Sequence, residues 1–296
     1  MLFLLKKEVR EMPTELPREE NPYILDSESV TEMARLMSQN HATTMALGGL
    51  FPERRDDLEG FDRVLDIGCG PGGWVLDVAQ KYPDKRVIGL DISNLMVQYA
   101  RAQAFAQRLE NAEFAIMNAL EPLQFDDNSF DLVNARFIVG FVARNAWLPL
   151  LKECLRVLRP GGMIRLTEGD LGTSTSASYD ELSMMVPKLL KASGLSFSPD
   201  GRSIGIIPVL PRLLREAGFK DMGKMAHVII NALDEQGSSM WIEDFKVTMQ
   251  TLLPVLVKLQ ITTPEQFNLL YEQAMLDVLS PEFSALLYFV TLWAKK

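Results

Sequence analysis

The sequence predicts an α/β fold built around a mostly parallel sheet. From residue 63 onward, short runs of β-branched and apolar residues alternate with amphipathic stretches that have helical spacing. This alternation is typical of βαβ units, whose right-handed crossovers place helices on both faces of a sheet. A Gly-rich segment directly follows the first run, at the strand-to-helix turn where such folds bind ligands.

The first five predicted strands lie in the middle of the chain, at residues 64–67, 86–90, 114–117, 130–133 and 162–166. Two of the helices between them are predicted from apolar residues that recur every three or four positions, because this spacing gives a helix one apolar face. The predicted stripes are Leu95, Tyr99, Ala102, Ala106 and Leu109 in one helix, and Leu148, Leu151, Leu155 and Leu158 in the other.

Two further strands are predicted in the last third of the chain, at residues 226–230 and 286–290, with a helical insertion between them. An apolar stripe within residues 242–252 predicts one helix there, which Pro254 should kink or restart. The four residues from Thr263 combine a capping box with a proline at the first helical position, which predicts the start of a second helix.

The N-terminal part is expected to be extended first and helical afterwards. Residues 10–25 contain three prolines and many acidic residues, which favour an extended lead-in. Asp26 is expected to cap a helix that runs to about Asn40, and residues 172–178 are expected to form a loop. The predicted division is a helical lid at 1–60, a sheet domain at 61–232 plus 283–296, and helical cap insertions at 171–210 and 233–282.

Composition excludes several classes of protein. The chain has 39 Asp+Glu against 30 Lys+Arg, which argues against binding long nucleic acid, because that binding needs a basic face. Only Cys69 and Cys154 could form a disulfide, and with two histidines at unrelated spacings no structural zinc site is expected. No apolar run reaches about 18 residues, and the first residues do not have the pattern of a signal peptide. A cytoplasmic protein without membrane or metal is expected.

The strongest chemical signal is the Gly-rich turn that follows Asp66 and Ile67. Gly68, Gly70 and Gly73 match the G-x-G-x-x-G pattern, so a nicotinamide dinucleotide is one candidate ligand. However, Asp66 would repel a pyrophosphate and favours a cationic ammonium or sulfonium group, and the proline within the turn removes a backbone N–H. A tight turn without a ligand is the alternative, although it would not need four glycines in six residues.

Asp91 ends the second predicted strand, beside the first strand at the same edge of the sheet. A carboxylate at this position can accept hydrogen bonds from both hydroxyls of a ribose. It could instead cap the helix that begins near Ser93, and the two roles are compatible. The sequence therefore points to a ligand that carries both a cationic group and a ribose.

Together these features resemble the class I S-adenosylmethionine-dependent methyltransferases, closely so over about residues 60–170. Asn118-Ala119 after the third strand, Phe-Asp-Leu-Val at 130–133 and the helix-to-strand turn at 155–162 carry the resemblance further. It implies a Rossmann-like, seven-stranded, mostly parallel sheet of order 3-2-1-4-5-7-6, with helices on both faces and a helical cap. The antiparallel seventh strand of that family fits residues 286–290. More loosely, the whole chain is similar to ubiquinone/menaquinone-biosynthesis-like and natural-product methyltransferases.

The resemblance also implies S-adenosyl-L-methionine as the cofactor. Asp66, Gly68 and Gly70 would surround its methionine moiety, and Cys69 lies in the same cofactor-binding turn without the features of a nucleophile. The other implied contacts are Asp91 at the ribose, Ile92 and Met96 along the adenine, Asn118 and Ala119 at the adenine edge, and Asn134 and Arg136 at the methyl-donor end. Asn118 stands where the family often has Asp. A hydrogen-bonding pair at a strand end is the alternative for the last two residues.

The implied function is in-line methyl transfer to a small, partly apolar molecule, with an oxygen or nitrogen acceptor preferred over carbon. A general base is needed only if the acceptor arrives protonated. The candidates for that base are His41, after the N-terminal helix, and Glu168 and Asp170, at the end of the fifth strand. A helix-end histidine and solvated loop acids are the alternatives. Methionines in the lid and cap, such as Met185 and Met249, suit either an adaptable acceptor pocket or core packing.

Other functions stay open at this point. An RNA or protein methyltransferase would need a basic groove or a peptide channel, whereas the lid and cap regions are acidic or apolar. A non-methylating enzyme such as a cyclase could keep the cofactor as a structural element, because the binding motif is shared. A nicotinamide-dependent dehydrogenase is a more distant alternative. A small-molecule acceptor is the expected partner of a monomer or homodimer.

Overall fold

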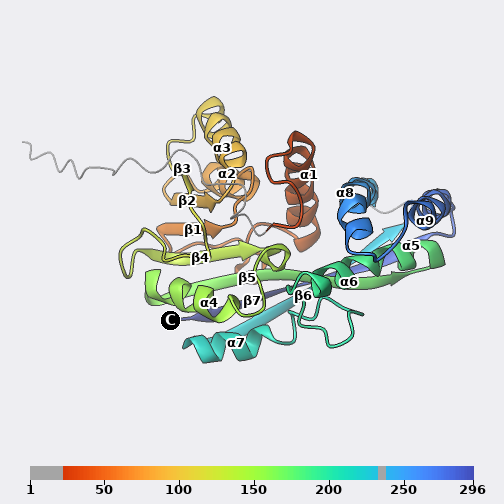
Figure 1. The fold of residues 1–296 in the computed structure, drawn as a ribbon. Coiled ribbons are helices and arrows are strands. Elements are labelled where there is room, and N and C mark those ends of the chain that lie inside the picture. The colour runs from red at the N-terminus through yellow and green to blue at the C-terminus, as the bar shows by residue number, and fades with distance from the viewer. Residues whose placement is uncertain (1–22, 233–237) are drawn as a thin grey trace, which may run out of the picture.

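The computed structural model describes residues 23–232 and 238–296, so most of the predicted lead-in at 10–25 lies outside the described residues. The centre is a seven-stranded sheet with the order β3-β2-β1-β4-β5-β7-β6 (Figure 1), which confirms the predicted order. Within these residues, the strand pairs are parallel except those of β7, which runs antiparallel to β5 and β6. The strands are β1 Arg63–Ile67, β2 Arg86–Asp91, β3 Ala112–Ile116, β4 Phe130–Arg136, β5 Leu158–Ser174, β6 Lys220–Ala232 and β7 Ser284–Lys295.

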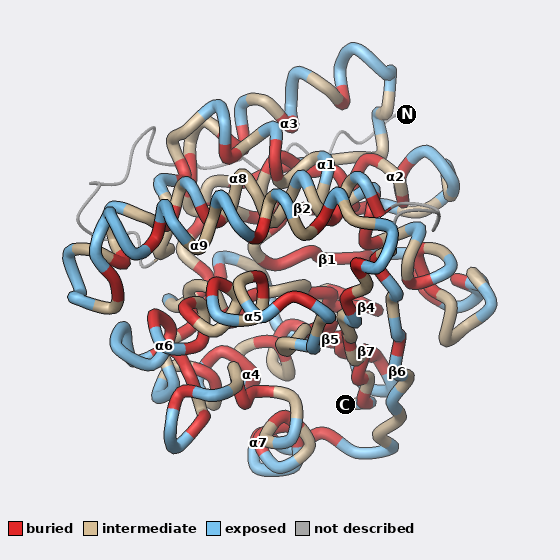
Figure 2. Tube along the Cα trace, turned by 90° about the vertical axis from the view of Figure 1, so that its right-hand side faces the viewer, coloured by how far each residue is buried: buried red, intermediate tan, exposed pale blue. Residues whose placement is uncertain are grey.

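Helices cover both faces of the sheet, as predicted. Successive residues of a strand point to opposite sides, so each strand packs against both layers of helices. On one face, α2 and α3 pack against Val64 and Val87, and on the other face α4 and α7 pack against Leu65 and Ile88. Figure 2 shows the strands as largely buried segments between helices that keep an exposed side. These helices are α2 Gly73–Lys81, α3 Asn94–Gln107, α4 Trp147–Val157 and α7 Leu210–Ala217.

The buried side of α3 differs from the predicted stripe. Met96, Ala100 and Ala104 are buried, whereas Ala102 of the predicted stripe is exposed. Ser93 caps the helix through its hydroxyl, and this start fixes which side turns toward the sheet. Alanine favours a helix on whichever side it stands, so the spacing of alanines carried little information about burial.

The fifth strand is much longer than predicted and includes the first part of the predicted loop at 172–178. Its far end pairs with β7 up to Ser174, opposite Ala285. Near Gly172 the two strands approach so closely that a Cβ would lie 1.5 Å from the carbonyl oxygen of Leu286. Glycine is therefore what lets the strand continue, and pairing with β7 overrides the local signal for a loop.

The cap consists of helices at the far end of these long strands (Figure 1). Met185, Met249 and Phe267 belong to its own apolar core. As predicted, the hydroxyl of Thr263 caps a helix that begins with proline, but the preceding helix continues through Pro254 instead of restarting there. The cap helices are α5 Ala177–Ser183, α6 Met185–Ala192, α8 Ser238–Lys258 and α9 Pro264–Asp277.

The N-terminal helix α1 (Val30–Leu47) begins and ends later than predicted. Its N-cap is Ser29 and not Asp26, because the Ser29 hydroxyl accepts a hydrogen bond from the backbone of Glu32, in the spacing of a capping box. The helix continues past Asn40 and ends at Gly48, whose φ of 82° is a left-handed conformation that suits glycine.

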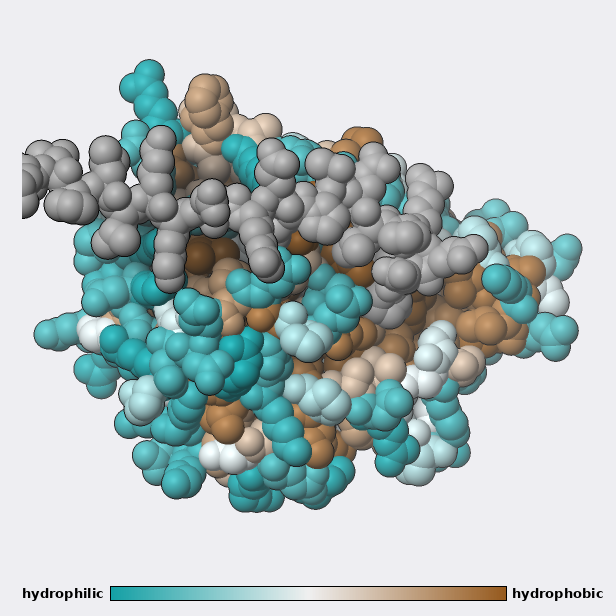
Figure 3. Space-filling model, turned by 60° about the vertical axis from the view of Figure 1, so that its left-hand side comes forward, coloured by the Kyte–Doolittle hydropathy of each residue, from teal (hydrophilic) through white to brown (hydrophobic). Residues whose placement is uncertain are grey.

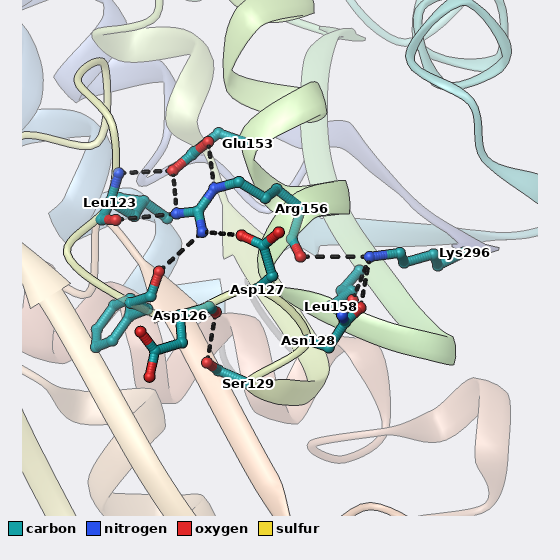
Figure 4. A network of polar contacts seen from close by, with 10 residues as sticks. Leu123, Asp126, Asp127, Asn128, Ser129, Glu153, Arg156, Leu158 and Lys296 are labelled. Atoms are coloured by element: carbon teal, nitrogen blue, oxygen red, sulfur yellow. Dashed lines mark hydrogen bonds and ion pairs between the residues drawn. The ribbon is translucent and has the colours of Figure 1, made fainter.

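A polar network fastens the end of α4 to the loop between β3 and β4 (Figure 4). Its centre is Arg156, which belongs to the helix-to-strand motif of residues 155–162. The partners of its guanidinium are the carbonyl oxygens of Leu123 and Phe125 and the carboxylates of Glu153 and Asp127. Lys296 adds a hydrogen bond of 2.7 Å to the carbonyl oxygen of Leu158. This part of the motif therefore closes the turn that leads into β5, at the opposite end of the strand from the cap.

Apolar side chains also reach the surface. Figure 3 shows them gathered across the middle of one face, between polar side chains. Exposed large apolar residues of β6, β7 and α9 include Val228, Ile230, Leu269, Leu276 and Leu286. Within residues 23–232 and 238–296, no helix is both long enough and apolar enough to cross a membrane.

Candidate functional site

A cavity lies at the carboxyl edge of β1, β2 and β4, between the sheet and α1. Open α/β sheets bind their ligands at this edge, where the strand order reverses. The cofactor-binding positions predicted from sequence gather here, except Asn134. The predicted residues in its wall are Asp66, Gly68, Cys69, Gly70, Asp91, Ile92, Met96, Asn118, Ala119 and Arg136.

In the Gly-rich turn, backbone atoms line the cavity directly, because the glycines have no side chains. Gly68 and Gly70 have φ of 66° and 53°, in the left-handed region that favours glycine. A Cβ on Gly68 would lie 3.0 Å from the ring of Phe141, and one on Gly73 would lie 2.8 Å from the side chain of Asn40. Side chains at these positions would fill the space between the turn and its neighbours, which explains why the motif needs glycine.

Asp66 supplies a carboxylate at one end of the cavity. The residue is only 4% exposed, and its Oδ1 accepts a hydrogen bond of 2.7 Å from the Nδ2 of Asn134. Burial raises the pKa of Asp66 to about 6, although Arg136, Asn134 and Arg165 act in the opposite direction. The group is therefore mostly ionised at neutral pH, and a cationic ligand would stabilise its charge.

Asn134 lies behind Asp66 and does not line the cavity. The residues Asp66, Asn134 and Arg165 stand in register on three adjacent strands, so their side chains point to the same face. The buried Asn134 accepts a hydrogen bond of 2.9 Å from Nη1 of Arg165, and Arg165 pairs with Glu53 at 2.7 Å. The direct contact with the methyl-donor end predicted for Asn134 is therefore replaced by a positioning role toward Asp66.

Arg136 places a cation in the cavity wall near Asp66. Burial lowers its pKa to about 10, and the charge of Asp66 acts in the opposite direction, so the guanidinium stays charged at neutral pH. Its Nη2 donates a hydrogen bond of 2.5 Å to Asn40, and its guanidinium carbon lies 5.9 Å from the ring centre of Trp74. One end of the cavity thus offers both an anion and a cation, as an amino-acid ligand would require.

Asp91 connects the Gly-rich turn with the start of α3. Its Oδ2 accepts a hydrogen bond of 2.8 Å from Gly70 N, and its Oδ1 accepts one of 2.9 Å from Ser93 N. Burial raises the pKa of this carboxyl above its ordinary value. Each oxygen can still accept another hydrogen bond, so this bracing contact and a ribose contact are compatible.

The part of the wall that follows β2 and β3 is mainly apolar and includes Ile92, Met96 and Met117. Asn118 also lines it, but the side-chain oxygen of Asn118 accepts a hydrogen bond from Leu120 N and its amide donates to a neighbouring glutamate. Asn118, which stands where the family often has Asp, thus forms its hydrogen bonds within a local turn. The sequence could not place this interaction, since it depends on the backbone after β3.

Sequence reasoning missed the side of α1 that closes the cavity, formed by Leu36, Gln39 and Asn40. Positions three and four apart share one side of a helix, but the mixed polarity of these residues gave no apolar stripe. It also missed Phe137 and Phe141, which follow β4 and line the cavity. Only their position after the fourth strand could have indicated them.

A buried ion pair holds α1 to α8 of the cap. Arg35 pairs with Asp244 at 2.7 Å and with Glu32 at 2.6 Å. The hydroxyl of Tyr23, which also lines the cavity, donates a hydrogen bond of 2.8 Å to Glu32. The cap is therefore connected through charged side chains to the wall of the cavity.

His41 and Asp170 lie away from the cavity wall, so this arrangement does not favour them as general bases. His41 stands within α1 and is exposed, because the helix continues beyond its predicted end. The carboxylate of Asp170 accepts hydrogen bonds from the backbone N–H groups of Leu171, Ile204 and Gly205. Its geometry is that of a group that holds the segment before α7 to β5.

Glu168 is also absent from the cavity wall. It is fully buried, its Oε1 accepts a hydrogen bond of 3.0 Å from Ile138 N, and burial raises its pKa to about 8. Even-numbered residues of β5 such as Leu166 point to the face covered by α4 and α7. The sequence located the strand end, but not the face to which this side chain turns.

Comparison with known proteins adds to this geometry. A family model described as a methyltransferase domain matches residues 64–162. The demethylmenaquinone methyltransferase of Geobacillus kaustophilus is 33% identical over 181 residues, which are 57% of this chain and 75% of that protein. The chain belongs to the class I S-adenosylmethionine-dependent methyltransferases. The resemblance identified from the motifs is thereby confirmed.

Two further relatives of this methyltransferase show how much of each chain is matched. The demethylmenaquinone methyltransferase of Lactococcus lactis is 39% identical over 115 residues, and the match spans 38% of this chain and only 43% of that relative. The crystal structure of the YcgJ protein of Bacillus subtilis covers 85% of this chain and 98% of its own, with a TM-score of 0.54 and 19% identity. That structural likeness supports the fold alone.

The cavity of the methyltransferase fits S-adenosylmethionine, the cofactor of its family. The charged groups Asp66 and Arg136 match an ammonium and a carboxylate, and Asp91 matches ribose hydroxyls. The absence of side chains at Gly68 and Gly70 leaves room beside the main chain. These assignments remain predictions that binding measurements can check.

Acidification should weaken cofactor binding through Asp66. Its pKa of about 6 means that the carboxyl becomes protonated below that pH and no longer attracts an ammonium group. The affinity for S-adenosylhomocysteine should then fall by up to about tenfold per pH unit, as expected for one linked proton. Calorimetric titration at several pH values measures this slope. The Asp66→Asn variant should bind weakly at neutral pH and lack the slope, and an unchanged slope in that variant would contradict the role of Asp66.

Removing Arg165 alone should destabilise the fold strongly. Arg165→Met leaves the buried Glu53 carboxylate unpaired, and such a change costs about 3–5 kcal/mol of unfolding free energy. The double variant Glu53→Met/Arg165→Met should lose less than Arg165→Met alone, because no buried charge is left without a partner. Urea denaturation of the unaltered protein, Arg165→Met, Glu53→Met and the double variant measures these differences. A double variant that loses the sum of both single losses would rule out this charge pairing.

Proposed function

We propose that this chain transfers a methyl group from S-adenosylmethionine to a small, partly apolar acceptor with a quinone-type ring. The observation that carries the proposal is a single cavity with three successive chemistries. Asp66 and Arg136 lie near the ends of the adjacent strands β1 and β4, whereas Asp91 ends β2 on the other side of β1 and the apolar residues around Met96 follow it. This order matches the amino acid, ribose and adenine parts of the methyl donor.

The proposed acceptor class rests on the curated relatives, which are demethylmenaquinone methyltransferases. The reduced form of such a ring carries hydroxyl groups on an otherwise apolar plane, in agreement with the small and partly apolar acceptor predicted from sequence. Tyr23, Phe137 and Phe141 add aromatic surface to the cavity wall. The preference for oxygen or nitrogen over carbon as the methylated atom stays a prediction.

S-adenosylmethionine held in this cavity would supply a methyl group that its sulfonium charge activates toward a nucleophile. The protein contributes positioning, which lowers a barrier by about 7–11 kcal/mol at best. Asp66 and Arg136 would fix one end of the donor and Asp91 its ribose. The rings of Phe137 and Phe141 favour a nearby cation through their π-faces.

The proposal does not need a general base in the cavity. Within the described part of the chain, the ionisable groups of the wall are Tyr23, Asp66, Cys69, Asp91 and Arg136. Burial raises the pKa of the Cys69 thiol, so the thiol stays protonated and is no nucleophile. An electron-rich hydroquinone ring can react from its own oxygen or carbon and release its proton to solvent.

Asp91→Ala should weaken binding of S-adenosylmethionine. Loss of two charge-assisted hydrogen bonds to the ribose would cost about 1.5–3 kcal/mol, or roughly a tenfold to hundredfold loss of affinity. Calorimetric titration measures this change, and circular dichroism checks that the variant is folded. Asp84→Ala, which removes an exposed carboxylate elsewhere on the surface, is the matched control and should bind normally. Unchanged affinity of Asp91→Ala would refute the ribose contact.

An assay with methyl-tritiated S-adenosylmethionine tests the function itself. We expect label in an extractable product when 1,4-dihydroxynaphthalene is supplied without oxygen, with an equal amount of S-adenosylhomocysteine formed. Parallel reactions contain RNA and protein extract. Label confined to either macromolecule would favour the RNA or protein methyltransferase alternative. Donor binding without any formation of S-adenosylhomocysteine would favour the non-methylating alternative.

A further inference from the structure

One side chain of α1 joins two other elements at the wall of the cavity. Asn40 lines the cavity, and its Oδ1 accepts a hydrogen bond of 2.5 Å from Nη2 of Arg136, at the end of β4. Its Nδ2 donates a hydrogen bond of 2.9 Å to Oδ2 of Asp77, on α2. A single amide of the N-terminal helix therefore connects the cation of the cavity wall with a carboxylate on the helix that follows the Gly-rich turn.

The two charged partners determine which way this amide is turned. A guanidinium can only donate hydrogen bonds and a carboxylate can only accept them. The amide oxygen of Asn40 must therefore face Arg136 and its nitrogen must face Asp77, since the reversed amide would lose both hydrogen bonds. Neither leucine nor aspartate at this position could form both bonds. The amide is thus suited to passing a fixed orientation from Asp77 to Arg136.

The third glycine of the G-x-G-x-x-G pattern makes room for this contact. Gly73 differs from Gly68 and Gly70 in that its φ is not in the left-handed region. However, a Cβ on Gly73 would lie only 2.8 Å from Nδ2 of Asn40. A side chain there would push Asn40 away from both of its partners. The space that this glycine leaves is therefore occupied by a side chain of α1.

The guanidinium of Arg136 has more donors than this contact uses. It carries five N–H groups, and among the residues that the structure describes, Asn40 alone accepts a hydrogen bond from it. Its contact with the ring of Trp74, at 5.9 Å, does not fix the direction of the N–H groups. Because burial disfavours the charged guanidinium, an anion in the cavity would stabilise it. A carboxylate can accept two parallel hydrogen bonds from a guanidinium that is correctly turned.

We propose that Asn40 and Asp77 are positioning residues that turn the guanidinium of Arg136 toward the carboxylate of the methyl donor. Asp77 does not line the cavity and acts through Asn40. The two parallel hydrogen bonds require the planes of the guanidinium and carboxylate to align, so an Arg136 without this support binds the carboxylate less well. The inference rests on the proposed function, which places the amino-acid part of the donor beside Arg136, and it assigns to α1 a part in selecting ligands that carry a carboxylate.

The test is calorimetric titration with two ligands. One is S-adenosylhomocysteine, and the other is its decarboxylated analogue, which keeps the ammonium group, the ribose and the adenine. The unaltered protein should bind S-adenosylhomocysteine about tenfold to hundredfold more tightly, the effect of charge-assisted hydrogen bonds to the carboxylate. Asn40→Leu should weaken its binding by about tenfold and leave binding of the analogue within about twofold. An equal loss for both ligands, or an unchanged preference between them, would overturn the proposal.

Variants of Asp77 separate positioning from a direct effect of charge. Asp77→Ala should weaken binding of S-adenosylhomocysteine, because Asn40 loses the partner that orients it. Asp77→Asn should retain binding, since its side-chain oxygen can still accept the hydrogen bond from Asn40. Removing a negative charge near Arg136 would act in the opposite direction and tighten carboxylate binding in both variants. Tighter binding in both, or the same loss in both, would therefore contradict the positioning role.

A surface variant and a stability measurement complete the experiment. Asp84→Ala removes the same charge from an exposed position, is the matched control, and should bind both ligands normally. Thermal unfolding shows whether each variant is folded at the temperature of the titration. A merely structural role of Asn40 would lower the melting temperature and weaken both ligands alike, and this result would also overturn the proposal.

These measurements do not depend on turnover. Loss of discrimination in Asn40→Leu, combined with no transfer of label in the tritium assay, would support the positioning role while refuting the proposed methyl transfer. Labelled product from an enzyme in which Asn40→Leu discriminates normally would have the opposite meaning. The failure of one hypothesis can therefore be told from the failure of the other.

Discussion

The fully buried guanidinium of Arg165 is the constraint on which the arrangement of the site depends. A charge in the middle of a sheet must be compensated, and Glu53 provides the compensation from the segment after α1. The remaining donor capacity of Arg165 fixes Asn134, which in turn fixes Asp66 at the cavity. Because the three strand residues stand in register, the orientation of the Asp66 carboxylate in the cavity wall is determined by packing in the protein core.

A second charged residue, Arg35, connects the cavity wall with the cap. Arg35 lies on α1, where neighbouring residues line the cavity, and its partner Asp244 lies on α8. The α8 helix also contributes Trp241 to the apolar cluster around Phe289, in which Phe137 packs. The wall of the cavity and the apolar cluster around Phe289 are therefore held by the same pair of helices.

The parts of the structure that the sequence predicted depend on local signals. The Gly-rich turn and Asp91 could be recognised because glycine, strand ends and motif spacing act over a few residues, and the strand order followed from the family resemblance that these motifs carry. Asn134 and Glu168 show the limit, since their roles depend on which face of the sheet each side chain meets. The α1 residues of the wall escaped prediction for the same reason, because their partners lie on elements that are distant in sequence.

The buried carboxyl groups of Glu168 and Asp66 differ in charge at neutral pH. Glu168 has a pKa of about 8 because of burial, so it is mainly protonated at pH 7 and adds no charge beside the segment that carries Phe137. Asp66, with its lower pKa, is the group that ionises, at the end where a cation is expected. Of these two carboxyl groups, the one that is mostly ionised at neutral pH lines the cavity, where a cationic ligand would stabilise its charge.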